Sequence, residues 1–346
     1  MKLSYTLMYD GNPRNAADQV TGLEKAGLDV VWVAEAYGFD SPTLMGYLAA
    51  RTETVEIGSA ILNIFSRTPG ALLQTAAGLD NVSGGRAVLG LGASGPQVVE
   101  GWHGVPYSRP LARTAEIVDL VRRGLRREVL TNDGVVKLPL AREDGAVTGL
   151  GKPLKLLNRP ERDRVPIWLA ALGPRSVEQA ATIADGWIPH LFHPEKANLV
   201  WGEALAAGRA RRSPELGPLQ VTAGGMVAVG EGPETKALLD LARPVFALYV
   251  GGMGAKGKNF YNDVARAYGY EQEAEQIQEL YLAGKKKEAE ALVPQEWLEA
   301  SNLVGPASYV KERIEAFRAA GVTHLTVLPV TDDPAATVAQ VKEWAS

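Results

Sequence analysis

Short apolar segments alternate with longer amphipathic segments along most of the chain, and this alternation limits the fold more than any other feature. Each apolar segment has the length of a β-strand, and most are rich in Val, Ile, Leu and Trp without strict polar alternation. Strands that are covered on both faces have this composition. The eight segments are Leu3–Tyr9, Val30–Ala34, Val55–Leu62, Ala87–Leu91, Val165–Leu172, Gly186–Pro189, Val221–Val229 and Thr323–Leu328.

Prolines mark the starts of the amphipathic segments. A proline is tolerated at the first helical position because the N–H of that residue has no partner within the helix. Seven such starts beside eight apolar segments indicate repeated strand–turn–helix units. Eight units in one chain favour a closed (β/α)8 barrel, the TIM-barrel fold, over an open sheet. The prolines are Pro13, Pro42, Pro69, Pro174, Pro194, Pro306 and Pro334.

Two segments are too long to be plain connections. Residues 128–164 contain Pro, Gly and charged residues and are predicted to form a loop excursion, whereas residues 231–305 are predicted to be mostly helical, with a helix over Glu271–Leu292. Long excursions from a compact domain tend to be lids or partner surfaces. We therefore expect one domain over residues 1–346, with a long helical insertion between strands 7 and 8.

Composition excludes several classes of protein. The chain has no cysteine, which excludes disulfides, thiolate nucleophiles, iron–sulfur clusters and cysteine-bound zinc. A net charge of −4 gives no general attraction to nucleic acid, and no run of 18 apolar residues would span a membrane. The first seven residues form a strand-like run without a signal-peptide pattern. We expect a cytoplasmic protein, a homodimer, that acts on a small molecule.

The segment Gly90-Leu-Gly-Ala-Ser-Gly95 fits the dinucleotide-binding pattern G-x-G-x-x-G and follows a predicted strand. In that fold an acidic residue stands about 20 residues further on, at the end of a second strand. No acidic residue occupies such a position here, so the context disfavours a Rossmann domain. The glycines still allow a close approach of the backbone to a ligand.

Gly173-Pro174-Arg175-Ser176 directly follows the fifth predicted strand and opens a helix. The first turn of a helix presents free N–H groups and a positive partial charge, which together form a site for phosphate. Arg175 and Ser176 would add a charge and a hydroxyl group. The same four residues also fit a tight turn into a helix without a ligand, and the local sequence supports both interpretations equally.

Other polar residues near strand ends are candidates for chemistry. His190 and His193 follow the sixth strand in a proline-containing loop, which favours a mouth-lining or hydrogen-bonded pair over a metal site. Glu35 and Tyr37 follow the second strand, at the edge that faces the active site of a barrel. Glu35 beside aromatic residues would act as an acid or base, or it would hydrogen-bond the loop backbone. We predict no metal site, and no G-x-S-x-G motif supports a hydrolase.

Three longer stretches resemble the bacterial luciferase-like superfamily. They are Ile57–Pro69, Leu79–Gly92 with its Ser-Gly-Gly-Arg motif, and Ile167–Trp187 with its Gly-Pro-Arg-Ser motif. The third stretch is similar specifically to the branch that uses the deazaflavin coenzyme F420. The resemblance covers nearly the whole chain and implies the barrel fold that the apolar segments predict.

The resemblance also implies places for the coenzyme. A non-prolyl cis peptide would lie behind the coenzyme ring at Ala60–Ile61, and Asn63 would lie beside the ring. The coenzyme phosphate would meet the turn Gly173–Ser176, formed by Gly173, Pro174, Arg175 and Ser176. The opposite rim would be lined by Gly92, Ala93 and Ser94.

The chain departs from some members of the superfamily. Several of them carry Asp-His at the end of strand two, where this chain has Glu35-Ala36, and the sugar-phosphate dehydrogenases carry a Glu where this chain has Gly95-Pro96. These differences argue against that dehydrogenase mechanism. The resemblance still implies hydride transfer between F420 and an unidentified small organic substrate, with loops 95–108, 128–164 and 231–305 shaping its pocket. The alternatives are a monooxygenase that uses flavin mononucleotide (FMN) and a coenzyme-binding protein without catalysis.

Overall fold

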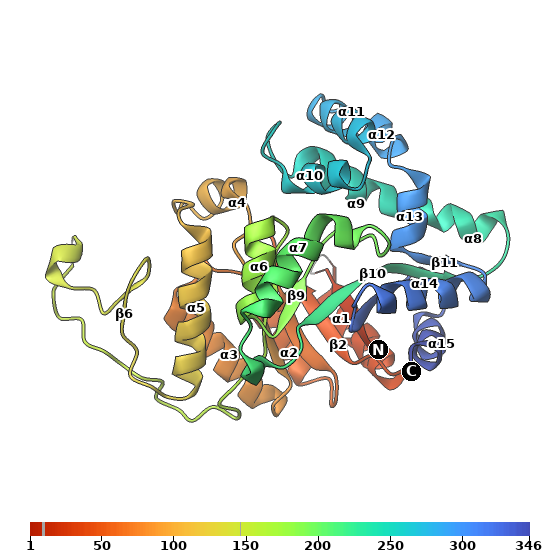
Figure 1. The fold of residues 1–346 in the computed structure, drawn as a ribbon. Helices are drawn as coiled ribbons and strands as arrows, with labels where there is room; N and C mark the ends of the chain where they lie inside the picture. Colours follow the sequence, from red (N-terminus) through yellow and green to blue (C-terminus); the bar gives the residue numbers. More distant parts are fainter. Residues whose placement is uncertain (9–10, 146) are drawn as a thin grey trace.

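The computed structural model describes residues 1–8, 11–145 and 147–346, and in these residues eight parallel strands close into a barrel (Figure 1). Strand order follows chain order around the ring, which closes because β10 pairs with β9 and β12, and β12 pairs with β1. The predicted (β/α)8 barrel is therefore confirmed. The strands are β1 (Lys2–Leu7), β2 (Val30–Ala34), β3 (Glu56–Ala60), β5 (Ala87–Gly92), β8 (Ile167–Ala170), β9 (Gly186–Ile188), β10 (Gln220–Val229) and β12 (His324–Pro329).

The apolar segments locate these strands to within a few residues. Val30–Ala34 coincides with β2, whereas Val55–Leu62 is divided between β3 and a short continuation, β4 (Leu62–Asn63). Tyr9, the predicted end of the first segment, lies outside the described residues.

Helices cover the outside of the barrel, and capping explains where several of them begin. The side chains of Asn12, Thr68 and Asp333 each accept an N–H of the first turn, directly before a proline at the first helical position. Three of the predicted starts differ from the first helical residue: Pro42 is the second residue of its helix, Pro306 is the N-cap, and Pro194 lies in a turn before its helix. The covering helices are α1 (Pro13–Lys25), α2 (Ser41–Ala49), α3 (Pro69–Ser83), α5 (Pro110–Leu125), α6 (Pro174–Ile183), α7 (Ala197–Ala210), α14 (Ala307–Ala319) and α15 (Pro334–Ala345).

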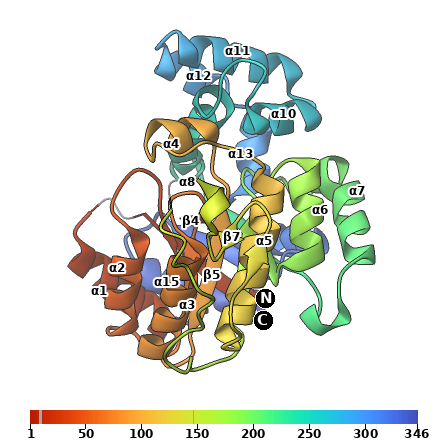
Figure 2. The same ribbon diagram turned by 90° about the vertical axis from the view of Figure 1, so that its left-hand side faces the viewer.

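The excursion at 128–164 lies against the outer side of α5 (Figure 2). It contains a hairpin of β6 (Asn132–Asp133) and β7 (Lys137–Leu138), followed by the turn η1 (Arg142–Asp144). Glu116 of α5 accepts hydrogen bonds from the backbone N–H groups of Val135 and Val136 and from the Asn132 amide. These contacts fix the excursion to the flank of the barrel. They do not support the prediction that it shapes the substrate pocket.

A second excursion between β10 and β12 forms a lobe beyond one end of the barrel (Figure 1). The predicted helix over Glu271–Leu292 is broken, because Gly284 adopts a φ of 79° that suits glycine. A short strand at the end of the excursion pairs with β10 and was not predicted. The elements are α8 (Pro233–Ala237), η3 (Leu238–Ala242), α9 (Arg243–Ala247), η4 (Leu248–Gly252), α10 (Phe260–Ala267), α11 (Glu271–Leu282), α12 (Lys286–Ala291), α13 (Gln295–Ser301) and β11 (Leu303–Gly305).

Two tryptophans fill the barrel near the amino ends of its strands. Trp32 and Trp168 meet edge to face with ring centroids 5.0 Å apart, and the ring of His324 packs against Trp168 at 4.9 Å. Glycines make room for them, because a Cβ at Gly58 would overlap Trp32 and one at Gly186 would overlap Trp168. Large and small residues thus alternate inside the barrel, as the taper of a closed sheet requires.

His324 gives the barrel interior a pH-dependent stability. Burial lowers the pKa of His324 to about 4, from an ordinary value near 6.5. The unfolded chain therefore binds this proton more readily, so the folded state is unaffected above pH 6.5 and loses stability as the pH falls toward 4. The loss at pH 4 is at most about 3 kcal/mol. Denaturant unfolding of the wild type and His324→Phe at pH 7.5 and 4.5 should show a smaller loss in the variant. Equal losses would contradict the assignment.

Candidate functional site

The carboxyl ends of four consecutive barrel strands bring the predicted site residues to one mouth. The strands β2, β3, β5 and β8 are neighbours in the ring. Glu35 and Tyr37 follow β2, and Ala60–Asn63 end β3 and form β4. Gly92–Ser94 follow in β5 and its loop, and Gly173–Ser176 open α6 after β8. In a (β/α)8 barrel this end carries the active site, so the predicted residues lie together at the end where a site is expected.

A bulge at the end of β3 is the central feature of the mouth. The peptide bond between Ala60 and Ile61 is cis although neither residue is proline, as the sequence resemblance predicted. Beside it, a Cβ at Gly90 would overlap the Ser59 carbonyl, and a Cβ at Gly92 would overlap the Ile61 side chain. The first two glycines of the G-x-G-x-x-G segment therefore let the bulge press against β5. They have a packing role that sequence analysis did not identify.

Asn63 is buried next to this bulge. Its side-chain oxygen accepts the N–H of Phe65 at 2.8 Å, and its carbonyl accepts the Ser66 hydroxyl at 3.2 Å. The side chain therefore shapes the turn that leaves β4. Its predicted position beside a coenzyme ring stays a prediction.

Glu35 is held by an ion pair and a helix start. The guanidinium of Arg67 donates to both carboxylate oxygens, at 2.6 and 2.9 Å, and the backbone N–H of Ser41 donates at 2.7 Å. Only 9% of the Glu35 side chain and 18% of the Arg67 side chain are exposed. These donors occupy both carboxylate oxygens, which favours the alternative in which Glu35 hydrogen-bonds the loop backbone over a role as an acid or base.

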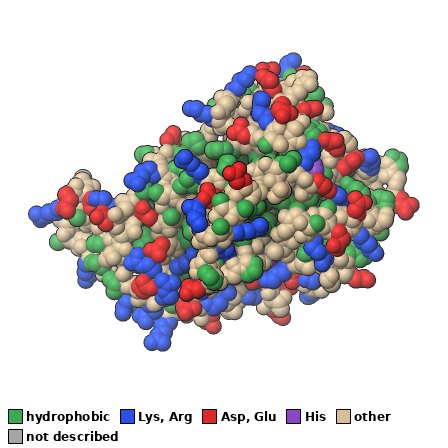
Figure 3. Space-filling view, in the orientation of Figure 1, with side chains coloured by type: hydrophobic (Ala, Val, Ile, Leu, Met, Phe, Trp, Pro, Cys, Tyr) green, Lys and Arg blue, Asp and Glu red, His purple; other side chains and the backbone are tan. Residues whose placement is uncertain are grey.

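Tyr37 stands in an exposed aromatic wall of the mouth. It is 63% exposed and lies near Trp102, with ring centroids 6.5 Å apart. The proximity of Tyr37, after burial, helps to raise the pKa of Tyr249 in the insertion. The loop after β2 therefore approaches the insertion across the mouth. Hydrophobic side chains gather in the hollow below the lobe (Figure 3).

The turn at Gly173–Ser176 offers fewer free donors than its sequence suggests. Pro174 has no N–H, and the Ser176 N–H and hydroxyl both donate to the Gly173 carbonyl, at 3.0 and 2.8 Å. Arg175 is exposed and, among the described residues, has no hydrogen-bond or ion-pair partner. The Arg175 side chain and its backbone N–H are therefore the groups of this turn that face a ligand most freely.

His190 is a site residue that sequence analysis assigned only loosely. It follows β9 and packs against two tyrosines of the insertion, Tyr249 and Tyr261, with ring centroids 3.9 and 5.7 Å away. The mouth-lining interpretation of His190 fits this position. No local signal in the sequence links a histidine to tyrosines about 60 to 70 residues later.

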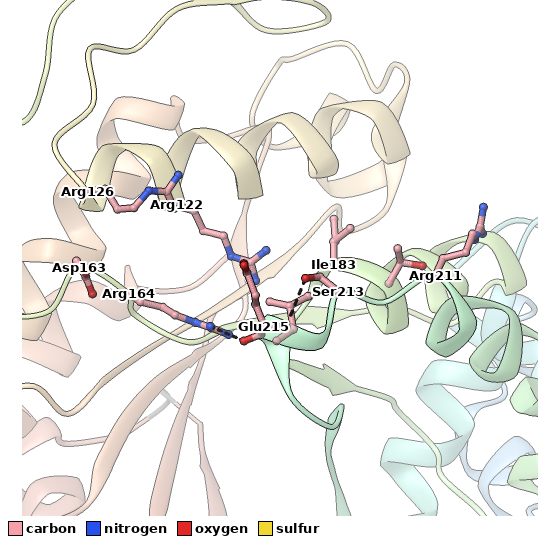
Figure 4. A pocket seen from close by; sticks show the side chains of 10 residues that line it. Arg122, Arg126, Asp163, Arg164, Ile183, Arg211, Ser213 and Glu215 are labelled. Carbon is pink, nitrogen blue, oxygen red and sulfur yellow. Dashed lines mark hydrogen bonds between the residues drawn. The ribbon is translucent and has the colours of Figure 1, made fainter.

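A separate hollow of about 480 Å³ lies near the amino ends of the strands, between the ends of α5, α6 and α7 (Figure 4). Its arginines already have acidic partners. Arg122 and Arg164 both pair with Asp185, and Arg126 pairs with Glu128. This network ties the helices to the barrel, and the candidate site remains the mouth at the other end.

Residues 1–8, 11–145 and 147–346 contain neither a metal-binding cluster nor a membrane-spanning helix. No three His, Asp or Glu side chains there come together in a way that could hold a metal ion. None of the helices described in those ranges is both long enough and apolar enough to span a bilayer.

Comparison with known proteins decides the family. The model of the luciferase-like monooxygenase family matches residues 1–324. The chain belongs to this family. A Mycobacterium tuberculosis protein whose name assigns it to the coenzyme F420-dependent oxidoreductases is 40% identical to this luciferase-like chain over 94% of both chains. A 5,10-methylenetetrahydromethanopterin reductase of Archaeoglobus fulgidus is 25% identical over 87% of this chain and 85% of its own.

Solved structures agree with the luciferase-like fold. The coenzyme F420-dependent tetrahydromethanopterin reductase of Methanopyrus kandleri superposes with a TM-score of 0.80 at 22% identity, covering 98% of this chain and 96% of that one. An F420-dependent secondary alcohol dehydrogenase gives 0.72 at 18% identity, covering 100% and 99%. At these identities the likeness concerns the fold alone.

The close approach of the bulge to β5 makes a prediction about stability. Gly90→Ala forces a methyl group into the Ser59 carbonyl, which is backbone and has little room to move, and overpacking of this kind costs about 3 kcal/mol. The control is Gly78→Ala on the exposed face of α3, where nothing lies near the new methyl group. It should gain up to about 1 kcal/mol. Urea unfolding measures both, and similar values for the two would refute the packing role.

The Glu35–Arg67 pair makes a second prediction. Arg67→Ala leaves a largely buried carboxylate without its guanidinium and should cost about 3 kcal/mol of unfolding free energy. Arg51→Ala, which removes an exposed partner of Asp18, should cost at most about 1 kcal/mol. Thermal unfolding of both variants tests the difference. A loss for Arg67→Ala no greater than for Arg51→Ala would show that the pair does not hold the mouth.

Proposed function

We propose that this chain is an oxidoreductase that binds coenzyme F420 at the barrel mouth and transfers a hydride between it and a small organic substrate. The observation that carries the proposal is the convergence of the cis bulge, Asn63 and the α6 turn on the ends of neighbouring strands. The F420-related name of the 40% identical relative supports the choice of coenzyme.

The residues at the mouth fit such a coenzyme. Arg175 has no partner in the described chain, and its backbone N–H lies in the first turn of α6, so both are suited to a phosphate. Gly173 lies near the exposed ring of Phe260, which closes the turn on the insertion side. The bulge at Ala60–Ile61 offers a backbone surface without charge. The anionic tail of the coenzyme would therefore bind at the α6 turn, and its apolar ring system would bind against the bulge.

When bound, the deazaflavin supplies a carbon centre, C5, that carries a hydride and disfavours activation of oxygen. The protein contributes position and exclusion of water. Asn63 and the bulge would support the ring, while Arg175 would hold the phosphate end. Tyr37 and Trp102 would narrow the opening on the β2 side.

The family name favours a second candidate, a monooxygenase that uses FMN. The same mouth and the same phosphate turn serve this function. A coenzyme-binding protein without catalysis is the third candidate. Which coenzyme the purified protein binds separates the first two, and turnover separates both from the third.

Fluorescence titration tests the proposal directly. The purified chain should bind F420 with a Kd in the micromolar range or below and FMN at least tenfold more weakly. Arg175→Ala should weaken F420 binding about tenfold, which corresponds to about 1.4 kcal/mol. Arg126→Ala, at the opposite end of the barrel, is the matched control and should bind as the wild type does. Equal or reversed affinities for the two coenzymes would overturn the choice of F420, and an unaffected Arg175→Ala would place the phosphate elsewhere.

A further inference from the structure

Three aromatic side chains with polar groups meet where the insertion covers the mouth. The ring centroids of His190 and Tyr249 are 3.9 Å apart, at an interplanar angle of 47°, and the rings of His190 and Tyr261 form a T-shaped pair with centroids 5.7 Å apart. The two tyrosine rings are themselves 4.7 Å apart. His190 belongs to the loop after β9, whereas the tyrosines belong to η4 and α10. The cluster therefore joins the barrel to the lobe above it.

Within the part of the chain that the structure describes, the polar atoms of this cluster have no hydrogen-bond partners. The Nε2 atom of His190 is fully enclosed without a hydrogen bond. Among the residues described, neither the other ring nitrogen of His190 nor the hydroxyl groups of Tyr249 and Tyr261 have one either. By contrast, the ring of His324 is hydrogen-bonded to Thr323 at 2.9 Å. Because an unsatisfied polar group is costly when buried, the enclosed Nε2 atom of His190, with two tyrosine hydroxyls beside it, is suited to a ligand that completes its hydrogen bonding.

Two buried asparagines hold the tyrosines in place. The Asn259 amide donates to the carbonyl of Tyr249 at 2.9 Å, and its oxygen accepts the N–H of Tyr261 at 2.9 Å. Asn262 donates to the carbonyls of Val250 and Ala274. Both asparagines are almost completely buried. The tyrosines therefore have a fixed backbone position before any ligand arrives, which lowers the entropy cost of binding.

The cluster is electrically neutral near pH 7. Burial lowers the pKa of His190 to about 4, and burial raises the pKa of both tyrosines. One imidazole nitrogen then donates and the other accepts. A ligand with a charged group would lose its hydration here without gaining an ion pair, whereas an uncharged oxygen would gain hydrogen bonds.

We propose that His190, Tyr249 and Tyr261 recognise the substrate by hydrogen-bonding the oxygen of an uncharged molecule with an apolar body. The inference rests on the proposed function in taking the mouth as the place of reaction. We call these three side chains the recognition point. The loop after β9 supplies His190, and the insertion supplies the two tyrosines.

Imidazole NMR is suited to the test because the chain has only four histidines. The probe is cyclohexanone, which has one uncharged oxygen on an apolar ring. Its titration into the full chain should shift the His190 ring signals, assigned by their loss in His190→Phe, and leave those of His324 unchanged. Methylcyclohexane, which lacks the oxygen, and cyclohexanecarboxylate, which is charged, should give at least tenfold weaker shifts at equal concentration. A larger His190 shift with either of these compounds would overturn the proposal.

Variants separate a ligand contact from a structural role. His190→Phe should weaken cyclohexanone binding at least tenfold, His190→Gln should recover part of it, and Tyr261→Phe, which removes only the hydroxyl, should weaken it about threefold. The melting temperature of Tyr261→Phe should match that of the wild type. Cyclohexanone binding that is unchanged in all three variants would overturn the proposal.

The coenzyme titration separates this proposal from the proposed function. If F420 binds and cyclohexanone leaves the His190 signals unchanged, the recognition point is wrong while the coenzyme assignment stands. If cyclohexanone shifts His190 and F420 does not bind, the recognition point stands and the coenzyme assignment fails. His190→Phe should bind F420 as the wild type does. A loss of F420 binding in this variant would place His190 against the coenzyme instead and overturn the substrate role.

Discussion

The geometry of the mouth depends on how closely the bulge after β3 approaches β5. Only glycine at positions 90 and 92 allows this approach, because a methyl group at either position would overlap the Ser59 carbonyl or the Ile61 side chain. The Ser59 hydroxyl reinforces the contact by hydrogen-bonding both the carbonyl and the N–H of Gly90. The bulge is thus fixed against β5, and the strands on either side of the β3–β5 pair, β2 and β8, carry other candidate residues.

Much of the fold could be predicted because it is encoded locally. Buried parallel strands are continuously apolar, and a capping side chain followed by proline marks a helix start, so both signals lie within a few residues. The Ser-Gly-Gly-Arg motif also has a local structural reason. The Arg86 guanidinium donates to the carbonyls of Ala49, Thr52 and Val55 and so joins α2, β3 and β5 at the amino end of the barrel.

The rest of the site depends on partners that are distant in the sequence. Glu35 pairs with Arg67, which lies 32 residues later. The sequence alone left open whether Glu35 acts as an acid or base or hydrogen-bonds the loop backbone, and this pairing favours the second role. His190 acquires its significance only from tyrosines on the insertion. Similarly, the donors of the α6 turn could be counted only once the Ser176 hydroxyl and N–H were seen to be used within the turn. Tertiary contacts, which have no local signature, decide each of these cases.

The short strand β11 gives the lobe an unusual relation to the barrel. Val229, the last residue of β10, pairs with Gly305, and Val227 pairs with Leu303, so the chain leaves and rejoins the barrel along one parallel ladder. The two ends of the intervening segment are held side by side whatever lies between them, and the entropy of closing such a loop grows only slowly with its length. The length and sequence of this segment can therefore change while the strands of the barrel stay unaltered. The insertion between β10 and β12 could then diversify independently of the barrel.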